Sequence, residues 1–449
     1  MVNNNIICVF DGEAGSCGKA KVCGEIATNP VYSVGASLTN SMPNAGHTFV
    51  DEYGVSHLFR NIPVASVNKE VELFIGPSSV IDMNEFKHEY DEHEHFLGNR
   101  KIYVHELVPL VTEEHKMREK KIIRSGSTYH GCAACNQDKI IRNPELEFFK
   151  GYKNAVVLKN EDWLDLLYKH LDSKDETVLF EGAQGCDLSL NFSGEHPNVT
   201  SRNISVSNML QEAGVSPRRL LYADMVIRPF PIRINDITRD GEYIYTGGYG
   251  TADKLTWSHI NFASKFGCYP TVDQFSDYDE ISDEIKIKLL NASTNQDKLQ
   301  IFGVNYTNIT LDDVTVVDAL EMERLINKRM GIRKYISEVI DLSDLPDPHL
   351  TDLSEMTSVT KMERKIFDLD IRKLKQNVRM NDPDGIYLNF FQHLNIEYAH
   401  RKGSYSETDI DRYVREYLNW LETTLGVDLN YLGTGKVNHE CIKKKELTL

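Results

Sequence analysis

Four polar segments that contain glycine hold the side chains of this chain best suited to act on a phosphorylated ligand. The first runs from Asp11 to Lys21, between a short apolar run and a helical pattern. A strand that passes through glycines into a helix directs backbone N–H groups at an anion. The segment is not a Walker A loop, because five residues separate Gly12 from Gly18-Lys19 and Ala20 replaces the hydroxyl that would meet Mg²⁺. Taken alone, it is equally compatible with an ordinary tight turn.

The other three segments place further polar groups beside glycines. Asn44 to Thr48 contains a histidine, His47, and a hydroxyl next to a glycine. Gly126 to Gly131 is a polar loop, and Phe180 to Gly185 directly follows a predicted strand. A lone histidine in such a loop is more often structural than catalytic. The argument for a phosphate site therefore depends on the occurrence of all four segments together.

Short apolar runs alternate with charged helical stretches, which favours a mostly parallel central sheet covered by helices. We predict an α/β fold in a single domain over residues 1–449. The segment from about 312 to 375 is helix-rich and highly charged, and we expect it to be an insertion on the sheet. The predicted strands are Ile6–Phe10, Glu72–Ile75, Lys101–Val104, Ala155–Leu158, Thr177–Phe180, Leu220–Ala223, Leu299–Val304 and Gly385–Phe391.

The composition limits the partners and the location that we expect. The chain has 449 residues, 67 acidic against 50 basic side chains, and a formal net charge of −17. Nucleic acids and anionic membranes select for a basic face, so we expect neither as a partner. No signal peptide and no run of about 18 apolar residues is found. We expect a cytoplasmic protein with its eight cysteines reduced.

The order of these motifs resembles that of the adenylosuccinate synthetase family. These enzymes activate the 6-oxo group of a purine nucleotide with a nucleoside triphosphate and replace it with aspartate. Asn44 to Thr48 and Phe180 to Gly185 reproduce the family's Asn-Ala-Gly-His-Thr and Phe-Glu-Gly-Ala-Gln-Gly without change. Four weaker matches are Gly15–Lys21 (family Gly-Asp-Glu-Gly-Lys-Gly-Lys), Ser127–Arg142 (phosphate-binding segment), Pro197–Ser201 (family Tyr-Val-Thr-Ser) and Gly433–Gly435 (family Ser-Thr-Gly, at the nucleotide base).

The resemblance implies chemical roles for matching residues. His47 would be the acid that stabilises charge as the γ-phosphoryl group moves, a role that suits a side chain titrating near neutral pH. Gln184 would hold the purine oxygen, and Lys19 would bring positive charge to the transferring group.

The resemblance also implies binding residues and partners. Asn44, Thr128 and Thr200 would bind the 5′-phosphate of a purine nucleoside monophosphate, and Arg142 would reach across the interface of a homodimer. The Gly46 carbonyl would ligate Mg²⁺. The expected residues at the nucleoside triphosphate are Gly15, Gly18, Lys21, Gly46, Thr48, Gly433, Thr434 and Gly435.

One departure from the family concerns the acceptor nucleotide. Ser16 stands where the family has the aspartate that removes the N1 proton of inosine monophosphate and ligates Mg²⁺. Serine does neither job well at neutral pH, but its hydroxyl tolerates a neighbouring 2-amino group. The same change marks a phage-borne branch of the family that acts on dGMP, so dGMP or GMP becomes the favoured acceptor.

A second departure concerns the phosphate donor. No Thr-Lys-Leu-Asp strand end offers a carboxylate to guanine, and the candidates Asn305–Asn308 and Asn389–Gln392 lack one. ATP or dATP is therefore favoured over GTP.

A third departure concerns the amine donor. The arginine-rich loop that grips aspartate should fall near Gly250–Trp257, which offers Lys254 alone. Two carboxylates are poorly paired by one lysine. Either arginines such as Arg228 or Arg233 come from elsewhere, or the amine donor is not aspartate.

The leading hypothesis is an ATP-dependent C–N ligase that uses aspartate as the expected amine donor. The alternatives are an ordinary synthetase using inosine monophosphate, aspartate and GTP, and a purine-nucleotide sensor without turnover. Three other features have unremarkable interpretations. A zinc site at Cys132 and Cys135 is disfavoured, His88–His95 is expected to be a solvated helix face, and Lys443–Lys445 an exposed tail.

Overall fold

The computed structural model describes residues 4–123, 127–239, 241–252, 363–405 and 412–444, together with residues 254, 255, 257, 260, 264, 355 and 410. Most of the expected insertion at 312–375 lies outside these residues, as does the predicted strand at 299–304. The expectation of one domain with an insertion therefore stays a prediction.

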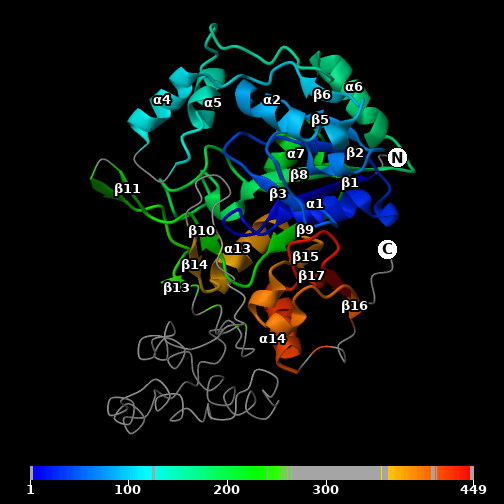
Figure 1. Ribbon diagram of the computed structural model, residues 1–449, viewed down its shortest axis with the longest axis vertical. Coiled ribbons are helices and arrows are strands. Elements are labelled where there is room, and N and C mark those ends of the chain that lie inside the picture. Colours follow the sequence, from blue (N-terminus) through cyan, green and yellow to red (C-terminus); the bar gives the residue numbers. More distant parts are fainter. Residues whose placement is uncertain are drawn as a thin grey trace.

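The described residues form an eleven-stranded sheet, shown in Figure 1. Every strand pair in it is parallel except β17 with β18. This confirms the predicted α/β fold with a mostly parallel sheet. In spatial order the strands are β16 (Gly403–Tyr405), β18 (Cys441–Lys444), β17 (Leu429–Gly433), β15 (Gly385–Leu388), β9 (Leu220–Ile227), β1 (Ile6–Asp11), β8 (Thr177–Gly185), β2 (Val34–Thr39), β5 (Glu72–Ile75), β6 (Ile102–His105) and β7 (Ala155–Leu158).

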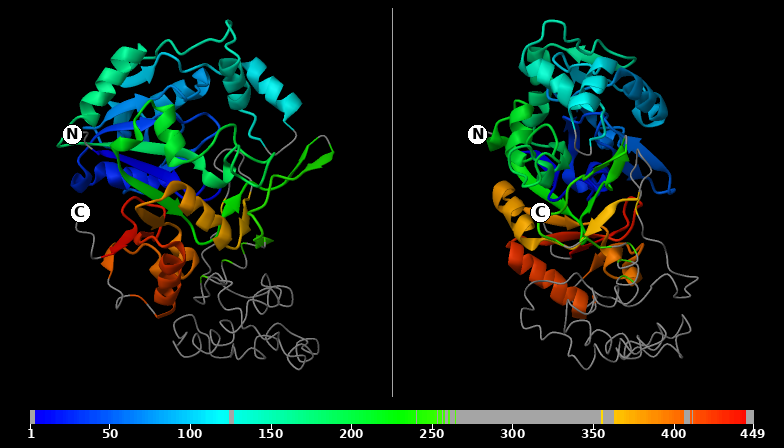
Figure 2. Two further views of the ribbon diagram at one scale, coloured as in Figure 1. Left: turned by 180° about the vertical axis from the view of Figure 1, so that it is seen from behind. Right: turned by 90° about the vertical axis from the view of Figure 1, so that its left-hand side faces the viewer.

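Helices cover both faces of this sheet, which explains why its central strands are rich in apolar residues. One core cluster joins the sheet to α6 (Asn160–Leu171), α7 (Val206–Glu212), α13 (Ile371–Asn381) and α14 (Arg412–Leu425). A second cluster joins it to α1 (Lys19–Thr28), α2 (Met83–Glu92) and α3 (Glu94–Leu97). In Figures 1 and 2, α4 (Glu113–Ile122) and α5 (Cys132–Ile140) lie at the opposite end of the molecule from α14.

Three small sheets complete the described part of the chain. β3 (His47–Val50) and β4 (Ser56–Phe59) form a hairpin, and β11 (Ile237–Arg239) with β12 (Glu242–Ile244) forms another that projects from the body in Figure 1 and the left view of Figure 2. β14 (Lys365–Phe367) lies between β10 (Ile232–Arg233) and β13 (Lys254–Leu255). Single 3₁₀ turns occur at Pro30–Tyr32, Val64–Val67, Cys186–Leu188, Pro217–Arg219, Phe391–His393 and Ile396–Tyr398.

Two predictions about charged segments need correction. Lys443 and Lys444 are not a frayed tail, because they belong to β18 and pair with Glu25 at 2.7 Å and with Glu422 at 2.8 Å. The stretch 88–95 is only partly solvated, since His88 is exposed while His93 is fully buried against Phe59. In both segments the side chains found apolar or oppositely charged neighbours from distant parts of the chain.

Within the described residues, no helix has the length and apolar character needed to cross a membrane.

Candidate active site

The loop between β1 and α1 is organised by the carboxylate of Asp11, the last residue of β1. Its Oδ1 accepts from the backbone N–H groups of Glu13 (2.9 Å) and Gly15 (3.1 Å), and its Oδ2 from that of Cys17 (3.0 Å) and from Lys19 Nζ (3.2 Å). These three N–H groups are therefore not free to bind a phosphate. The predicted anion site narrows to the start of α1, where the first N–H groups have no intrahelical acceptor.

Glycines let this loop and the end of β8 approach closely. Gly15 and Gly18 have φ of 103° and 86°, which L side chains rarely adopt. A Cβ on Gly185 would lie 2.3 Å from the Glu13 carbonyl oxygen and 2.4 Å from the Gly15 nitrogen. Gln184, directly before Gly185, has a φ of 66° and stands at the carboxyl end of β8 beside the loop.

Two buried lysines belong to the same loop and helix. Lys19 Nζ lies 3.2 Å from Asp11 Oδ2 and 3.2 Å from the Gly15 carbonyl oxygen. Lys21 Nζ instead donates to the carbonyl oxygens of Gly435 (2.7 Å) and Glu440, and burial lowers its pKa to about 8. Lys21 therefore ties α1 to the segment that contains Gly433, Thr434 and Gly435.

His47 begins β3 and is buried, whereas Gly46 and Thr48 on either side of it are exposed. Its Nε2 is buried and has no hydrogen-bond partner among the described residues. Burial, followed by the nearby charge of Lys19, lowers the pKa of His47 to about 3. The imidazole is therefore neutral at pH 7 in this structure, which differs from the expectation of a side chain titrating near neutral pH.

The residues expected at the 5′-phosphate come from three loops. The backbone N–H of Asn44 donates to Cys132 at the start of α5, so the Asn44 loop contacts the segment that follows Thr128. Thr200 lies in the loop after β8, where its N–H donates to the Leu188 carbonyl at 2.8 Å. Arg142, two residues beyond α5, is exposed on the surface.

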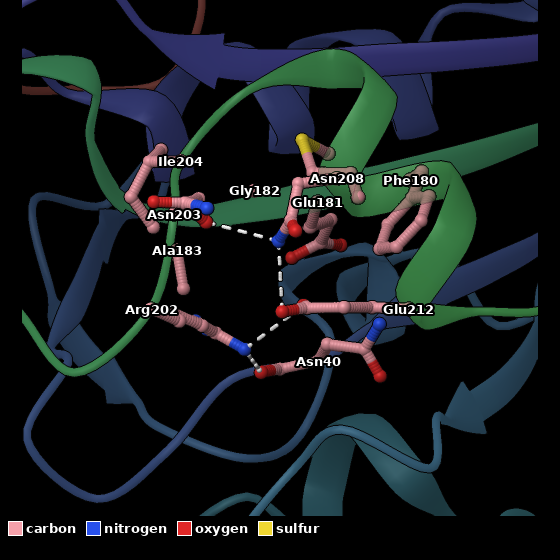
Figure 3. Close-up of a pocket in the computed structure, with 11 residues that line it drawn as sticks. Asn40, Phe180, Glu181, Gly182, Ala183, Arg202, Asn203, Ile204, Asn208 and Glu212 are labelled. Carbon is pink, nitrogen blue, oxygen red and sulfur yellow. Dashed lines mark hydrogen bonds and ion pairs between the residues drawn. The ribbon is translucent and has the colours of Figure 1, made fainter. Parts of the chain in front are cut away.

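A small cavity flanks β8, but none of the predicted site residues lines it among the described residues. Figure 3 shows Arg202 pointing to Asn40 and Glu212 there, with its Nη1 2.8 Å from the Asn40 carbonyl oxygen. Glu181, from the same Phe-Glu-Gly-Ala-Gln-Gly motif as Gln184, accepts from the backbone N–H groups of Val64 and Ala65 at 2.8 and 2.9 Å. This carboxylate anchors a 3₁₀ turn, and burial raises its pKa to about 7.

Two arginines surround Ser16, the residue that departs from the family motif. Arg364 Nη1 donates to Ser16 Oγ at 3.0 Å, and Arg228 Nη1 donates to the Ser16 carbonyl oxygen at 3.1 Å. Arg228 is fully buried, pairs with Glu355 through both terminal nitrogens, and stacks on Phe390 at 4.0 Å. Of the two arginines proposed from the sequence, Arg228 therefore reaches the site.

The other one, Arg233, contacts the Pro197–Ser201 segment and not Ser16. Its guanidinium donates to the backbone carbonyls of Asn198, Thr246 and Gly248. Arg364 was not predicted as a site residue, because its charged neighbours Glu363 and Lys365 placed it in the expected charged insertion. Lys254 is exposed on β13. This strand pairs with β14, which begins directly after Arg364.

Asn389 connects the loop to the end of the sheet near Gly433. Its Nδ2 donates to the carbonyl oxygens of Cys17 (2.9 Å) and Gly18 (3.2 Å). Its Oδ1 is buried and without a hydrogen-bond partner among the described residues, close against Gly433. The other predicted base-reading segment, Asn305–Asn308, lies outside the described residues.

The described residues do not by themselves make a metal site. Among them no group of three or more histidine, cysteine, aspartate or glutamate side chains could hold a metal ion. The loop before α1 has two carboxylates: Asp11 accepts four hydrogen bonds, and Glu13 accepts from the Arg228 backbone N–H at 3.2 Å and from the Cys17 thiol at 3.2 Å. With the Gly46 carbonyl as its expected protein ligand, Mg²⁺ would have to take most of its ligands from phosphate and water.

Comparisons with known proteins agree with the motifs. A family model described as adenylosuccinate synthetase matches residues 14–147. The N6-succino-2-amino-2′-deoxyadenylate synthase of Vibrio phage phiVC8 is 28% identical over 268 residues, which are 57% of this chain and 74% of that protein. The adenylosuccinate synthetase of Methanocaldococcus jannaschii is 29% identical over 234 residues, 50% of this chain and 65% of that protein.

A solved structure extends the likeness to nearly the whole chain. It is the succinoaminodeoxyadenylate synthetase of cyanophage S-2L, bound to dGMP and to dATP as an energy donor, with a TM-score of 0.64 and 19% identity. The alignment covers 98% of this chain and 95% of that one, and it shows a common fold.

Proposed function

We propose, on the premise that this chain is a relative of the adenylosuccinate synthetases, that it phosphorylates the 6-oxo group of dGMP or GMP with ATP or dATP and replaces it with aspartate. The chain is an enzyme of the C–N ligase class to which that family belongs. The product would be of the 2-aminoadenylosuccinate type.

The observation that carries this proposal is Ser16 and its arginine partner. Where the family holds a carboxylate at purine N1, this site holds a neutral hydroxyl that accepts from Arg364. Guanine differs from hypoxanthine in its 2-amino group, next to N1. The Ser16 hydroxyl can lie beside both the N1–H and the 2-amino group of guanine. It cannot act as the base that a carboxylate would be. The names of the phage relatives support the same acceptor.

The chain's own groups supply positioning and charge stabilisation for the phosphoryl step. Gln184 would hold the purine O6 while that oxygen attacks the γ-phosphorus. Lys19 would stabilise the charge on the phosphoryl group that is transferred. The Nε2 of His47 is buried and has no hydrogen-bond partner among the described residues, and donating to a phosphate oxygen would satisfy it. The negative charge of the triphosphate would raise the His47 pKa from its low unliganded value.

The choice of an adenine donor rests on Asn389. Its amide nitrogen is used by the Cys17 and Gly18 carbonyls, so it presents one oxygen and no carboxylate. Guanine needs two acceptors for its N1 and N2 protons, while the 6-amino group of adenine needs one. We therefore favour ATP or dATP over GTP.

The choice of aspartate as amine donor is supported by Arg364 beside Ser16. Arg228 is fully buried and already forms a bidentate pair with Glu355, so Arg364 is the guanidinium group near Ser16 that would pair with a carboxylate of aspartate. An amino acid other than aspartate stays the alternative.

Three finer expectations belong to the same proposal. Mg²⁺ would arrive with the triphosphate and neutralise part of its charge, with Gly46 as its backbone ligand. The enzyme would be a homodimer in which Arg142 reaches the partner's nucleotide, and it would work in the cytoplasm.

The test is the acceptor preference of the wild type and of Ser16→Asp. We expect the wild type to prefer dGMP or GMP over inosine monophosphate, and the variant to shift the ratio of kcat/KM toward inosine monophosphate, because a carboxylate restores a base for N1. Phosphate release with each acceptor, under matched ATP and aspartate, measures the ratio. Ser16→Ala is the control that removes the hydroxyl without adding a base.

Two outcomes would replace the proposal. A tenfold wild-type preference for inosine monophosphate, about 1.4 kcal/mol in the wrong direction, would favour the ordinary synthetase. Nucleotide binding without phosphate release under any combination would favour the sensor. Mass spectrometry of products from ATP, dGMP and a pool of amino acids would identify the amine donor.

A further inference from the structure

Among the described residues, the arginines around Ser16 are not fully balanced by carboxylates. Arg228 and Glu355 form a bidentate pair, with Nη1 3.2 Å from Oε2 and a shorter contact between Nη2 and Oε1. Arg364 makes no ion pair with a described carboxylate within hydrogen-bond distance, and shares Glu355 with Arg228 as a longer-range neighbour. Two guanidinium groups therefore face one glutamate.

The other described titratable groups around these two arginines do not cancel the excess positive charge. Glu13 accepts from the Arg228 N–H at 3.2 Å and from the Cys17 thiol at 3.2 Å, and burial raises its pKa well above the usual value, which favours its neutral form. His393 lies 3.9 Å from Glu355, and burial lowers its pKa to about 3, so it is neutral. Lys19 is already paired with Asp11. Among the described groups that face Ser16, one positive charge thus remains.

The hydrogen bond from Arg364 also fixes the role of the Ser16 hydroxyl. Because Oγ accepts from Nη1, the hydroxyl proton is directed away from the guanidinium. In the proposed reaction the ligand beside Ser16 is the N1, C6 and O6 edge of the purine, which becomes negative as N1 loses its proton. The Ser16 hydroxyl, held as a hydrogen-bond donor next to the positive charge of Arg364, would stabilise that negative edge.

We propose that Arg364 is a positioning residue that holds Ser16 as a hydrogen-bond donor and supplies the positive charge that promotes ionisation of purine N1–H, in place of a carboxylate base. The inference rests on the proposed function. In the step, the N1–H bond breaks and water takes the proton. The N1 electron pair moves through C6 to O6, the O6–P bond forms, and the bond from the γ-phosphorus to the bridging oxygen breaks, leaving its electrons on the nucleoside diphosphate.

The test is the pH dependence of kcat with dGMP. If a cation promotes N1 ionisation, its loss moves the rising acid limb of the profile to higher pH. We expect Arg364→Gln to move the limb up by about one pH unit, which lowers kcat on that limb about tenfold, with a smaller change in KM for dGMP. Arg364→Lys, which keeps the charge, should restore most of the wild-type limb.

Arg219→Gln is the matched control. Arg219 lies directly before the amino end of β9, pairs with Asp172 at 2.6 Å and is remote from Ser16, whereas Arg228 follows the carboxyl end of the same strand. We expect this control to keep the wild-type limb. An unchanged limb in folded Arg364→Gln would overturn the inference.

A second measurement uses the wild type alone, so that it does not depend on a variant that folds. The ultraviolet spectrum of dGMP bound together with ADP should report N1 ionisation at a lower pH than that of free dGMP. Equal titration of free and bound dGMP would contradict the role of the charge. Absence of phosphate release by the wild type would instead refute the proposed function, so the two failures are distinguishable.

Discussion

His47 shows how burial decides what a single side chain can do. Its imidazole is shielded on β3, its Nε2 lacks a partner among the described residues, and its pKa is lowered to about 3. A neutral imidazole can donate one hydrogen bond without changing its charge. In the proposed reaction, His47 would become an acid only after a polyanion had bound.

We predict that His47→Ala loses at least about 100-fold in kcat, because a general acid or a positioned donor contributes about 10²- to 10⁴-fold. Phosphate release at saturating substrate measures the loss. His57→Ala is the matched control: it removes a buried histidine from β4 of the same hairpin, where Nε2 faces Asp51 at 3.2 Å, and should keep turnover. Equal activity of the His47 variant and the wild type would remove His47 from the mechanism.

At the scale of residues, the sequence predicted the motifs but not their partners. Ser16 was recognised as a departure because a local motif surrounds it. Arg364 is 348 residues away in the chain, and no local pattern reports which side chain will reach Ser16 Oγ. The internal bonds of Asp11 were also missed, since a carboxylate that folds back on its own loop has the same sequence as one that binds a ligand.

Strand β9 carries an acidic residue in the middle of the sheet. Asp224 is buried between β1 and β15, and burial, followed by the nearby charge of Asp384, raises its pKa to about 7. An unfolded aspartate ionises near pH 3.8. The folded state therefore keeps a proton that the unfolded state has lost, and the contribution of Asp224 to stability is lost as pH rises from 3.8 to 7.

We predict that Asp224→Asn stabilises the protein more at pH 8 than at pH 5, by up to about 4 kcal/mol at the higher pH, because the variant has no charge to bury. Urea unfolding at the two pH values measures the difference. Asp82→Asn is a control of opposite sign: Asp82 caps α2 and pairs with Lys116, and these contacts hold its pKa low, so its loss should destabilise at pH 8. A pH-independent effect of Asp224→Asn would contradict the assignment.

At the scale of elements, the apolar runs of buried strands were the reliable signal. Glu72–Ile75 and Ala155–Leu158 agree with β5 and β7 at both ends; Gly76 ends the first run, and Asn154 and Lys159 border the second. Thr177–Phe180 is extended to Gly185 in β8, since pairing with β1 continues into the glycine-containing motif. The Lys443 strand was missed because its stabilising partner, Glu25, lies in α1.

For the whole molecule, the main open proposal is the homodimer. Arg142 is exposed after α5, while Gln184 lies beside the loop of the same chain. If each site takes Arg142 from the partner, a dimer of one Arg142→Ala chain and one Gln184→Ala chain holds one intact site.

We predict that the two variants are each nearly inactive and regain activity when mixed, up to about a quarter of the wild-type value, because random exchange makes half of the dimers mixed and each of these has one working site. Phosphate release before and after mixing measures the recovery. Mixing Arg142→Ala with itself at the same total concentration is the control, and no recovery would count against a shared site.

The buried cysteine thiols make it possible to measure how often this protein opens. All seven described cysteines are buried, and burial raises the pKa of each, so in the closed protein they resist alkylation. The eighth, Cys268, can be replaced by serine. In the Cys268→Ser variant, the rate at which the buried cysteines are alkylated reports how often the protein opens. Cys17 lies in the loop beside Ser16, so a nucleotide that closes the loop should slow the labelling of this thiol before that of Cys8 in the sheet.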